Sequence, residues 1–335
     1  MLKTQNFLDW LQKSRRKTSH NNDFWHFKYK VTTKKHLLSN INQKLNLGSY
    51  QFEPAVVIYR QMKEPIILWS AQDSLVLKTL SESLKAKSHT NFSKNCISNK
   101  GNGGIKKAFN VINKNIATHK YIYRTDIKKF YNSIDHQILL DKLSNFTANN
   151  EYEIIKRHLN RIEWQNGEYK EIKQGISKSS ALSPVLGCIY LHELDMAMEK
   201  LDVVYQRYTD DFIIMAKTKH KLRDAVKKVK QMLSNLNLVE HPEKTDYRNF
   251  NNPKATAFNF LGVKIGRLGV EDIRETTKKN FKDKINQLYE YLQTLISIRR
   301  FVRVDTHLET KVTMQILLQI KYFGNYYKYI SRFFV

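Results

Sequence analysis

Two adjacent aspartates, Asp210 and Asp211, interrupt two apolar runs in the stretch VVYQRYTDDFIIMAK. The residues on both sides are rich in β-branched and aromatic types, which predicts a strand before the pair and a strand after it. Neighbouring carboxylates repel each other, and neither aspartate belongs to a helical pattern. We therefore expect a hairpin of two buried strands with the carboxylates at or near its tip.

A second predicted apolar strand also ends in an aspartate. Asp126 closes the run YIYRTD, and Asp135 follows at the start of the next helix. Alone, Asp126 could cap a helix and the Asp210–Asp211 pair could be a solvated turn. Two acid-tipped strands can instead cluster three carboxylates, which repel one another unless cations neutralise them. Hard oxygen ligands favour Mg²⁺ or Mn²⁺, and two such ions about 4 Å apart clamp the oxygens of a phosphoryl displacement.

The overall charge points to a polyanionic partner. The 335 residues carry a formal net charge of +26, which favours nucleic acid over its alternative, a membrane surface. No apolar run approaches the ~18 residues of a membrane span. The two cysteines, Cys96 and Cys188, make neither a disulfide framework nor a zinc pattern. The first residues lack an apolar signal region, so we expect a cytoplasmic location and no membrane partner.

Strands and helices alternate through the middle of the chain, and both ends have helical patterns. This arrangement predicts an α+β core with helical additions. The expected helices cover residues 1–45, 72–90, 108–119, 136–162, 180–201, 219–237 and the tail from about 272; the expected strands cover 55–62, 121–126 and 258–265, with a hairpin around Asn166-Gly167.

Seven motifs follow one another between about residues 45 and 265. Together they resemble the motifs of bacterial reverse transcriptases, the group that includes retron, group II intron and defence-associated enzymes. The motifs are WSAQDSLVLKTL and KGNGGIKKA (fingers), RTDIKKFYNSIDH (first metal aspartate), GISKSSALSPVLGCIYLHELD (template and nucleotide), RYTDDFIIMA (YxDD), LNLVEHPEKT (palm) and FNFLGVKI (primer grip).

The resemblance implies a right-hand polymerase with fingers, palm and thumb. In the palm, an antiparallel sheet packs against helices. The implied division is 1–45 as a basic helical extension, 46–120 as fingers, 121–268 as palm with some fingers segments, and 269–335 as a short helical thumb.

Site roles follow from the same resemblance. Asp126 and Asp210 would bind both metal ions, Asp211 would be a weaker ligand, and Ile127 would add its carbonyl. Lys244 would be the general acid for the leaving pyrophosphate. Tyr131 would lie against C2′ of the incoming sugar while Phe130 enters the core. The remaining implied residues are Gly175, Ser183 and Pro184 on the template side, Gly262 in the primer grip, and Arg60 and Lys63 near the triphosphate.

Several of these roles have a plainer alternative. Lys244 could be a surface lysine, Gly262 a bulge glycine, and Arg60 and Lys63 solvated strand residues. The register of Phe130 and Tyr131 could also be reversed.

One stretch departs from the family. Ser177, Lys178 and Ser179 stand where a Pro-Gln-Gly-like run is common, so template handling is expected to be unusual.

The sequence therefore predicts an RNA-directed DNA polymerase with two Mg²⁺ ions (Mn²⁺ as substitute), an RNA template, deoxynucleotides and a DNA product. Only about 70 residues follow FNFLGVKI, which suggests a stand-alone enzyme of bacterial antiviral defence or a retron-like system. A dedicated non-coding RNA or partner protein is a further candidate. The alternatives are a template-independent or fixed-repeat polymerase, and a nucleic-acid-binding scaffold with a vestigial site.

Overall fold

The computed structural model describes most of the chain. The described residues are 23, 26, 27, 29, 30, 36–60, 63–88, 92–99, 101–299 and 306–331. Most of the predicted N-terminal helical extension lies outside them, and its described helix is α3, His36–Asn46. No helix among these residues has the length and apolar character needed to cross a membrane.

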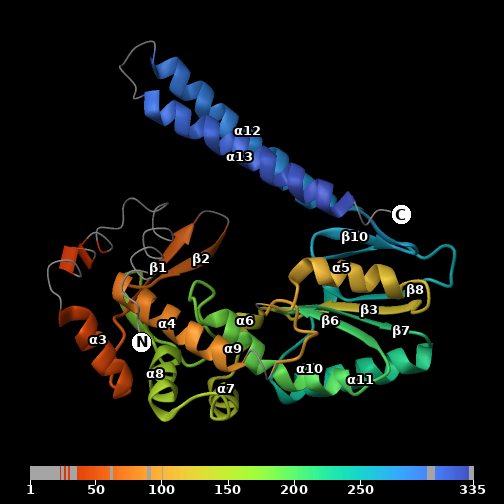
Figure 1. The fold of residues 1–335 in the computed structure, drawn as a ribbon, viewed down its shortest axis with the longest axis horizontal. Coiled ribbons are helices and arrows are strands. Elements are labelled where there is room, and N and C mark those ends of the chain that lie inside the picture. Colours follow the sequence, from red (N-terminus) through yellow and green to blue (C-terminus); the bar gives the residue numbers. More distant parts are fainter. Residues whose placement is uncertain are drawn as a thin grey trace.

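A four-stranded antiparallel sheet forms the centre of the molecule, in the order β6-β7-β3-β8. The inner strands are buried on both faces, which explains their unbroken apolar runs. Helix α5 covers one face and α11 the other (Figure 1). The bounds are β3 Tyr121–Asp126, β6 Val204–Tyr208, β7 Asp211–Ala216, β8 Asp246–Asn249, α5 Gly104–Asn115 and α11 Lys219–Asn235.

A second sheet, in the order β2-β1-β4-β5, lies on the opposite side of the molecule from β8 (Figure 1). The predicted hairpin is confirmed, because Asn166 and Gly167 both have positive φ between β4 and β5. Such a two-residue turn matches the twist of its strands. The bounds are β1 Ala55–Arg60, β2 Lys63–Leu68, β4 Ile162–Gln165, β5 Glu168–Glu171 and, packed beside them, α4 Ala71–Ser88.

Two predicted long helices are each divided. The 136–162 region forms α7, His136–Leu143, and α8, Asn149–Leu159, and its end belongs to β4. Helix α8 restarts because the Glu151 carboxylate accepts a hydrogen bond from the Ala148 amide. The 180–201 region forms α9, Ser183–Tyr190, and α10, His192–Glu199. Leu191 between them has φ −96° and ψ 5°, outside the helical range.

The last predicted strand is also divided. FNFLGVKI forms the hairpin of β9, Phe258–Phe260, and β10, Val263–Gly266, because Leu261 and Gly262 both take positive φ. Residues 269–273, assigned from the sequence to the helical tail, form β11, Gly269–Ile273, beside β10. Helices α12, Glu275–Arg299, and α13, Thr306–Ser331, then form a long antiparallel pair that projects from this small sheet (Figure 1).

Candidate active site

The predicted acidic hairpin is present. Tyr208 and Asp211 pair across β6 and β7, and Thr209-Asp210 is the turn between them. Thr209 has φ +59°. This conformation costs a β-branched residue roughly 1–3 kcal/mol and persists only where contacts with the surrounding structure hold it. Two contacts do so: the Thr209 amide donates to Ser98 Oγ (3.2 Å), and Arg207 Nη1 donates to the Thr209 carbonyl (2.7 Å).

A buried ion pair supports this turn from below. The Arg207 side chain is fully buried on β6 and pairs with the Asp195 carboxylate of α10 through its Nε (2.7 Å) and Nη2. Tyr205 also donates to Asp195 (2.9 Å). A buried charge pair holds together only when its hydrogen bonds are satisfied, so this network fixes the direction of the hairpin.

The strand end that carries Asp126 lies next to the same turn. Asp126 pairs with Asp211 across β3 and β7, and the Ile127 amide donates to the Asp210 carbonyl (3.3 Å). Burial, and then the negative charge of Asp126, raise the pKa of Asp210. Two of the predicted carboxylates therefore share one electrostatic environment.

Basic groups hold the other side of this acidic site. Arg124 binds Asp211 through Nε (3.0 Å) and Nη2 (2.9 Å), and Lys244 Nζ lies 2.8 Å from Asp126 Oδ2. Burial raises the pKa of Asp211 to about 6 against the opposing effect of Arg124, so this carboxylate is ionised at neutral pH.

The predicted three-carboxylate metal site stays a prediction: the charges of Asp126 and Asp210 both act on Asp211, while Lys244 pairs with Asp126 and Arg124 pairs with Asp211. In the part of the chain that the structure describes, no three acidic, histidine or cysteine side chains converge as a ready-made metal site. The remaining donors still fit hard cations. They are carboxylate oxygens whose mutual repulsion a cation relieves, and the Lys244 ammonium already stands beside Asp126 as a cation would.

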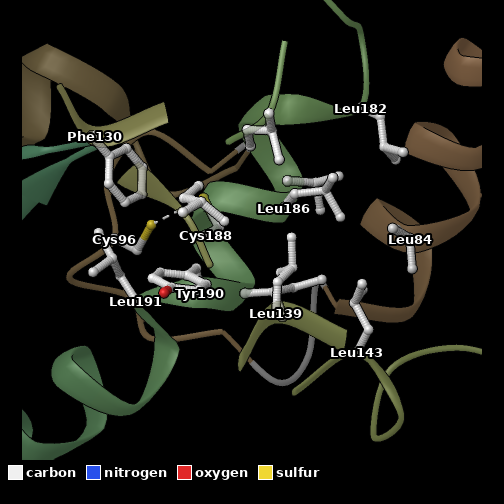
Figure 2. Close-up of a cluster of buried hydrophobic side chains, with 14 of the residues drawn as sticks. Leu84, Cys96, Phe130, Leu139, Leu143, Leu182, Leu186, Cys188, Tyr190 and Leu191 are labelled. Carbon is white, nitrogen blue, oxygen red and sulfur yellow. Dashed lines mark hydrogen bonds between the residues drawn. The ribbon is translucent and has the colours of Figure 1, made fainter. Parts of the chain in front are cut away.

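The aromatic pair after Asp126 divides between core and site. Phe130 is 2% exposed and lies beside Cys188 in the core, as Figure 2 shows. Tyr131 is half-buried, and burial, followed by the charge of Asp210, raises its pKa to about 12. Helix α9 passes close to both rings at Gly187, where a Cβ would lie 3.0 Å from Phe130 Cε1. Phe130 is therefore the core residue of the pair, and the role of Tyr131 at the incoming sugar stays a prediction.

A cavity of about 750 Å³ lies between the second sheet and the segment that contains Gly175, Lys178 and Ser179. Gly175 has φ +81°, and a Cβ there would lie 2.8 Å from the Asn132 carbonyl oxygen. Ser179 Oγ donates to the Ile67 carbonyl of β2, and Lys178 pairs with Glu64 at 2.5 Å. The unusual Ser177–Ser179 run therefore connects the central part of the molecule to the second sheet.

The remaining predicted residues take separate positions. Ser183 is buried at the start of α9 and donates to the Ser177 carbonyl (2.5 Å), and Pro184 follows it on the surface. Gly262 has φ +84° in the β9–β10 turn. Arg60 and Lys63 are cross-strand partners at the ends of β1 and β2, and their side chains lie outside the described part of the structure.

Three residues of the site escaped the sequence analysis: Arg124, Arg207 and Gly187. Arg124 had a readable signal, because it precedes Asp126 by two residues in a strand and therefore points to the same side. Arg207 and Gly187 had none, since their partners Asp195 and Phe130 are distant in sequence.

Comparisons with known proteins agree with this geometry. Residues 65–265, more than half of the chain, match the reverse transcriptase (RNA-dependent DNA polymerase) family. An uncharacterised 91 kDa protein in a cob intron of Schizosaccharomyces pombe is 27% identical over 170 residues, which are 49% of this chain and 21% of that protein. The chain thus spans about a fifth of the length of this relative.

Solved structures show the same fold at low identity. A telomerase from Candida albicans, in complex with the TWJ fragment of telomeric RNA, superposes with a TM-score of 0.54 at 12% identity over 86% of this chain and 56% of that one. The apo telomerase of Candida tropicalis gives 0.55 at 14% identity over 83% and 60%. The fold is therefore that of a right-hand polymerase, and the chain belongs to the reverse transcriptase family.

Proposed function

We propose that this protein extends a primer on an RNA template by two-metal nucleotidyl transfer to make DNA. One observation carries the proposal: Asp126 and Asp210, from strand ends far apart in sequence, share one acidic environment at the tip of a buried hairpin. A buried pair of like charges is unfavourable alone and favourable around divalent cations.

The roles at the carboxylates follow from their positions. Asp126 and Asp210 hold the ions, and Asp211 contributes more weakly because Arg124 engages it. The Ile127 carbonyl is available as a further ligand, since its amide already points to Asp210. Bound Mg²⁺ ions would activate the primer hydroxyl and neutralise charge on the phosphates.

Lys244 is proposed as the proton donor to the leaving pyrophosphate. Its side chain is 49% exposed, and it contacts Asp126 through a single ion pair. When ions occupy the carboxylates, the lysine no longer neutralises Asp126, so its ammonium can turn toward the departing oxygen. An ammonium can act as general acid at that position.

Substrate contacts complete the proposal. Tyr131 excludes the 2′-hydroxyl by its bulk, and the segment around Gly175, Ser183 and Pro184 backs the template and the incoming base. Gly262 marks the primer grip, and Arg60 and Lys63 are proposed to meet the triphosphate. The 750 Å³ cavity lies beside Gly175, which supports placing the template and the incoming base next to this segment.

Primer extension with defined templates tests the proposal. Wild-type protein should copy an RNA template of known sequence, and the product sequence should match it. Products made without a template, or with a fixed repeat on every template, would favour the template-independent alternative. Binding without any synthesis would favour a scaffold with a vestigial site.

The biological setting is a separate proposal. From the resemblance of the motifs to those of bacterial reverse transcriptases, we propose a bacterial enzyme of the retron-like or antiviral defence kind acting in the cytoplasm; the fungal relative, in contrast, lies in an intron. Sequencing the complementary DNA that the protein makes in its native cells would distinguish these settings. A single dedicated non-coding RNA copied repeatedly would support the retron-like setting, and copies of intron RNA would contradict it.

A further inference from the structure

A second groove, of about 730 Å³, lies between α11 and the edge strand β8. The apolar side chains of Leu222 and Val226 on α11 and the Tyr121 side chain on β3 line it. Four basic side chains of α11 line it as well, namely Lys219, Arg223, Lys227 and Lys230, and Arg248 of β8 is a fifth. No acidic residue is among the residues that line it.

The four basic residues form one row on α11. They recur every three or four residues, so they lie on one side of the helix, and at 1.5 Å per residue the row is about 16 Å long. Like charges at this spacing destabilise a helix. Within the described part of the chain, none of the four side chains has an ion pair or a hydrogen bond.

Three other titratable residues of the same helix have partners, whereas Lys228, which does not line the groove, has none within the described residues. Lys221 pairs with Asp202, and His220 lies 2.9 Å from Asp224. Most of the unpaired charge on α11 therefore lies along the groove, and a polyanion is the kind of partner that relieves the repulsion.

The opposite wall of the groove adds an aromatic surface. Tyr247 on β8 is 51% exposed, and its ring packs against Tyr123 with centroids 4.8 Å apart. Arg248 beside it already pairs with Asp246, so the charge of the groove rests on α11. A row of cations facing an exposed ring is the arrangement that binds single-stranded nucleic acid through phosphates and stacked bases.

This groove is distinct from the catalytic site. Tyr121 and Asp126 are the two ends of β3, about 17 Å apart at the rise of a strand. Helix α11 covers the face of the central sheet opposite α5, whereas the α12–α13 pair projects on the side of α5 (Figure 1). Nucleic acid in the groove would not occupy the space between the carboxylates and the second sheet.

We propose that the α11–β8 groove binds a single-stranded segment of RNA that lies outside the template–primer duplex, holding it by its phosphates. The choice of RNA over other polyanions rests on the proposed function, in which RNA is the template.

Binding measurements with two RNAs test this site. One is a short template–primer duplex, and the other is the same duplex with a single-stranded RNA extension of about 20 nucleotides. The groove variant replaces Arg223, Lys227 and Lys230 by Gln. The control variant replaces Lys114, Lys200 and Lys254, which are exposed and do not line the groove, by Gln.

The wild-type protein should bind the extended RNA more tightly than the short duplex. In the groove variant this gain should disappear, and the slope of log affinity against log salt should fall in magnitude by about 2, from about 0.7 per lost phosphate contact. The control variant should keep both the gain and the slope. Thermal unfolding should show that both variants are folded.

Three results would overturn the proposal. The extension could give wild-type protein no gain, the two variants could lose affinity equally, or a DNA extension could give the gain while RNA does not. DNA synthesis on the short template–primer duplex is measured separately, so that failure of the proposed function can be told from failure of the groove. If wild-type protein binds as expected but makes no DNA, the proposed function fails while the groove stands.

Discussion

Arg124 ties Asp211 to the segment that carries Lys244. Its Nε and Nη2 donate to the two Asp211 oxygens at 3.0 and 2.9 Å, while its Nη1 donates to the Lys244 carbonyl at 2.8 Å. One guanidinium therefore sets the distance between the second aspartate of the hairpin and the proposed proton donor. The Lys244 side chain in turn donates to Asp126. The position of Arg124 therefore influences Asp211 directly and Asp126 through Lys244.

Replacing Arg124 by Lys tests this arrangement. The charge is kept, but a lysine has no planar fork and cannot bind Asp211 with two parallel bonds. We expect kcat to fall about 10- to 100-fold, as is common when a partner of a metal-site residue is lost. The Mg²⁺ concentration for half-maximal activity should also change.

Arg248→Lys is the matched control, because Arg248 pairs with Asp246 of its own strand, β8, and lies away from the carboxylates. Equal loss in both variants would show that Arg124 matters only for folding.

Asp126→Asn and Asp210→Asn should each reduce DNA synthesis to background. Each change removes a negative charge that the ions need, whereas the loss of a repelling acid leaves the fold intact. Primer extension and thermal unfolding measure the two effects. Full Mg²⁺-dependent activity in either variant would refute the assignment, and Asp202→Asn, at an exposed residue outside the site, serves as control.

Tyr131→Ala should raise ribonucleotide incorporation relative to deoxynucleotide by at least roughly tenfold, about 1.4 kcal/mol of selectivity. The half-buried Tyr131 ring lies in the field of Asp210, whereas Phe130 is 2% exposed in the core. Phe130→Ala should therefore lower stability by roughly 3–5 kcal/mol instead. Competition between the two nucleotides and urea unfolding measure these effects, and the reverse pattern would exchange the two assignments.

Activity should depend on pH and Mg²⁺ together. Burial and the Asp126 charge raise the pKa of Asp210, so this carboxyl keeps its proton to a higher pH than an ordinary aspartate. Activity should therefore rise as the pH rises through the raised pKa of Asp210, because the ions bind only the ionised carboxylate. A tenfold increase in Mg²⁺ should move the acidic limb of the kcat/KM profile down by up to about one pH unit if each bound ion displaces one proton. An acidic limb whose midpoint stays at the same pH when the Mg²⁺ concentration changes would contradict the proposed ligand role of Asp210.

Asp195→Asn should lower the free energy of unfolding by roughly 3–5 kcal/mol, because it leaves the buried Arg207 guanidinium without its counter-charge. Asp246→Asn removes a partly exposed ion pair with Arg248 and should cost at most about 1 kcal/mol. Denaturant unfolding of both variants measures the difference. A similar small cost for both would show that the hairpin does not depend on the Asp195–Arg207 pair.

The sequence by itself determined the acidic hairpin, the strand that ends in Asp126 and the turn at Asn166-Gly167. These features are local: apolar runs, turn residues and alternation are set by neighbours within a few positions. The order of the motifs also predicted the reverse transcriptase family and its fold, which the comparisons confirm, whereas the bacterial subfamily stays a prediction. Arg124 was within reach of the same local reasoning.

Only the tertiary structure decided how the carboxylates are distributed and where the long helices break. Asp211 is bound by Arg124 and Asp126 by Lys244, and the 180–201 helix breaks at the fully buried Leu191. The support of the hairpin by Asp195 and the α11–β8 groove likewise depend on residues from separate elements. Such features arise from packing and from charge pairs between distant segments, and a local pattern in the sequence does not encode the distance between them.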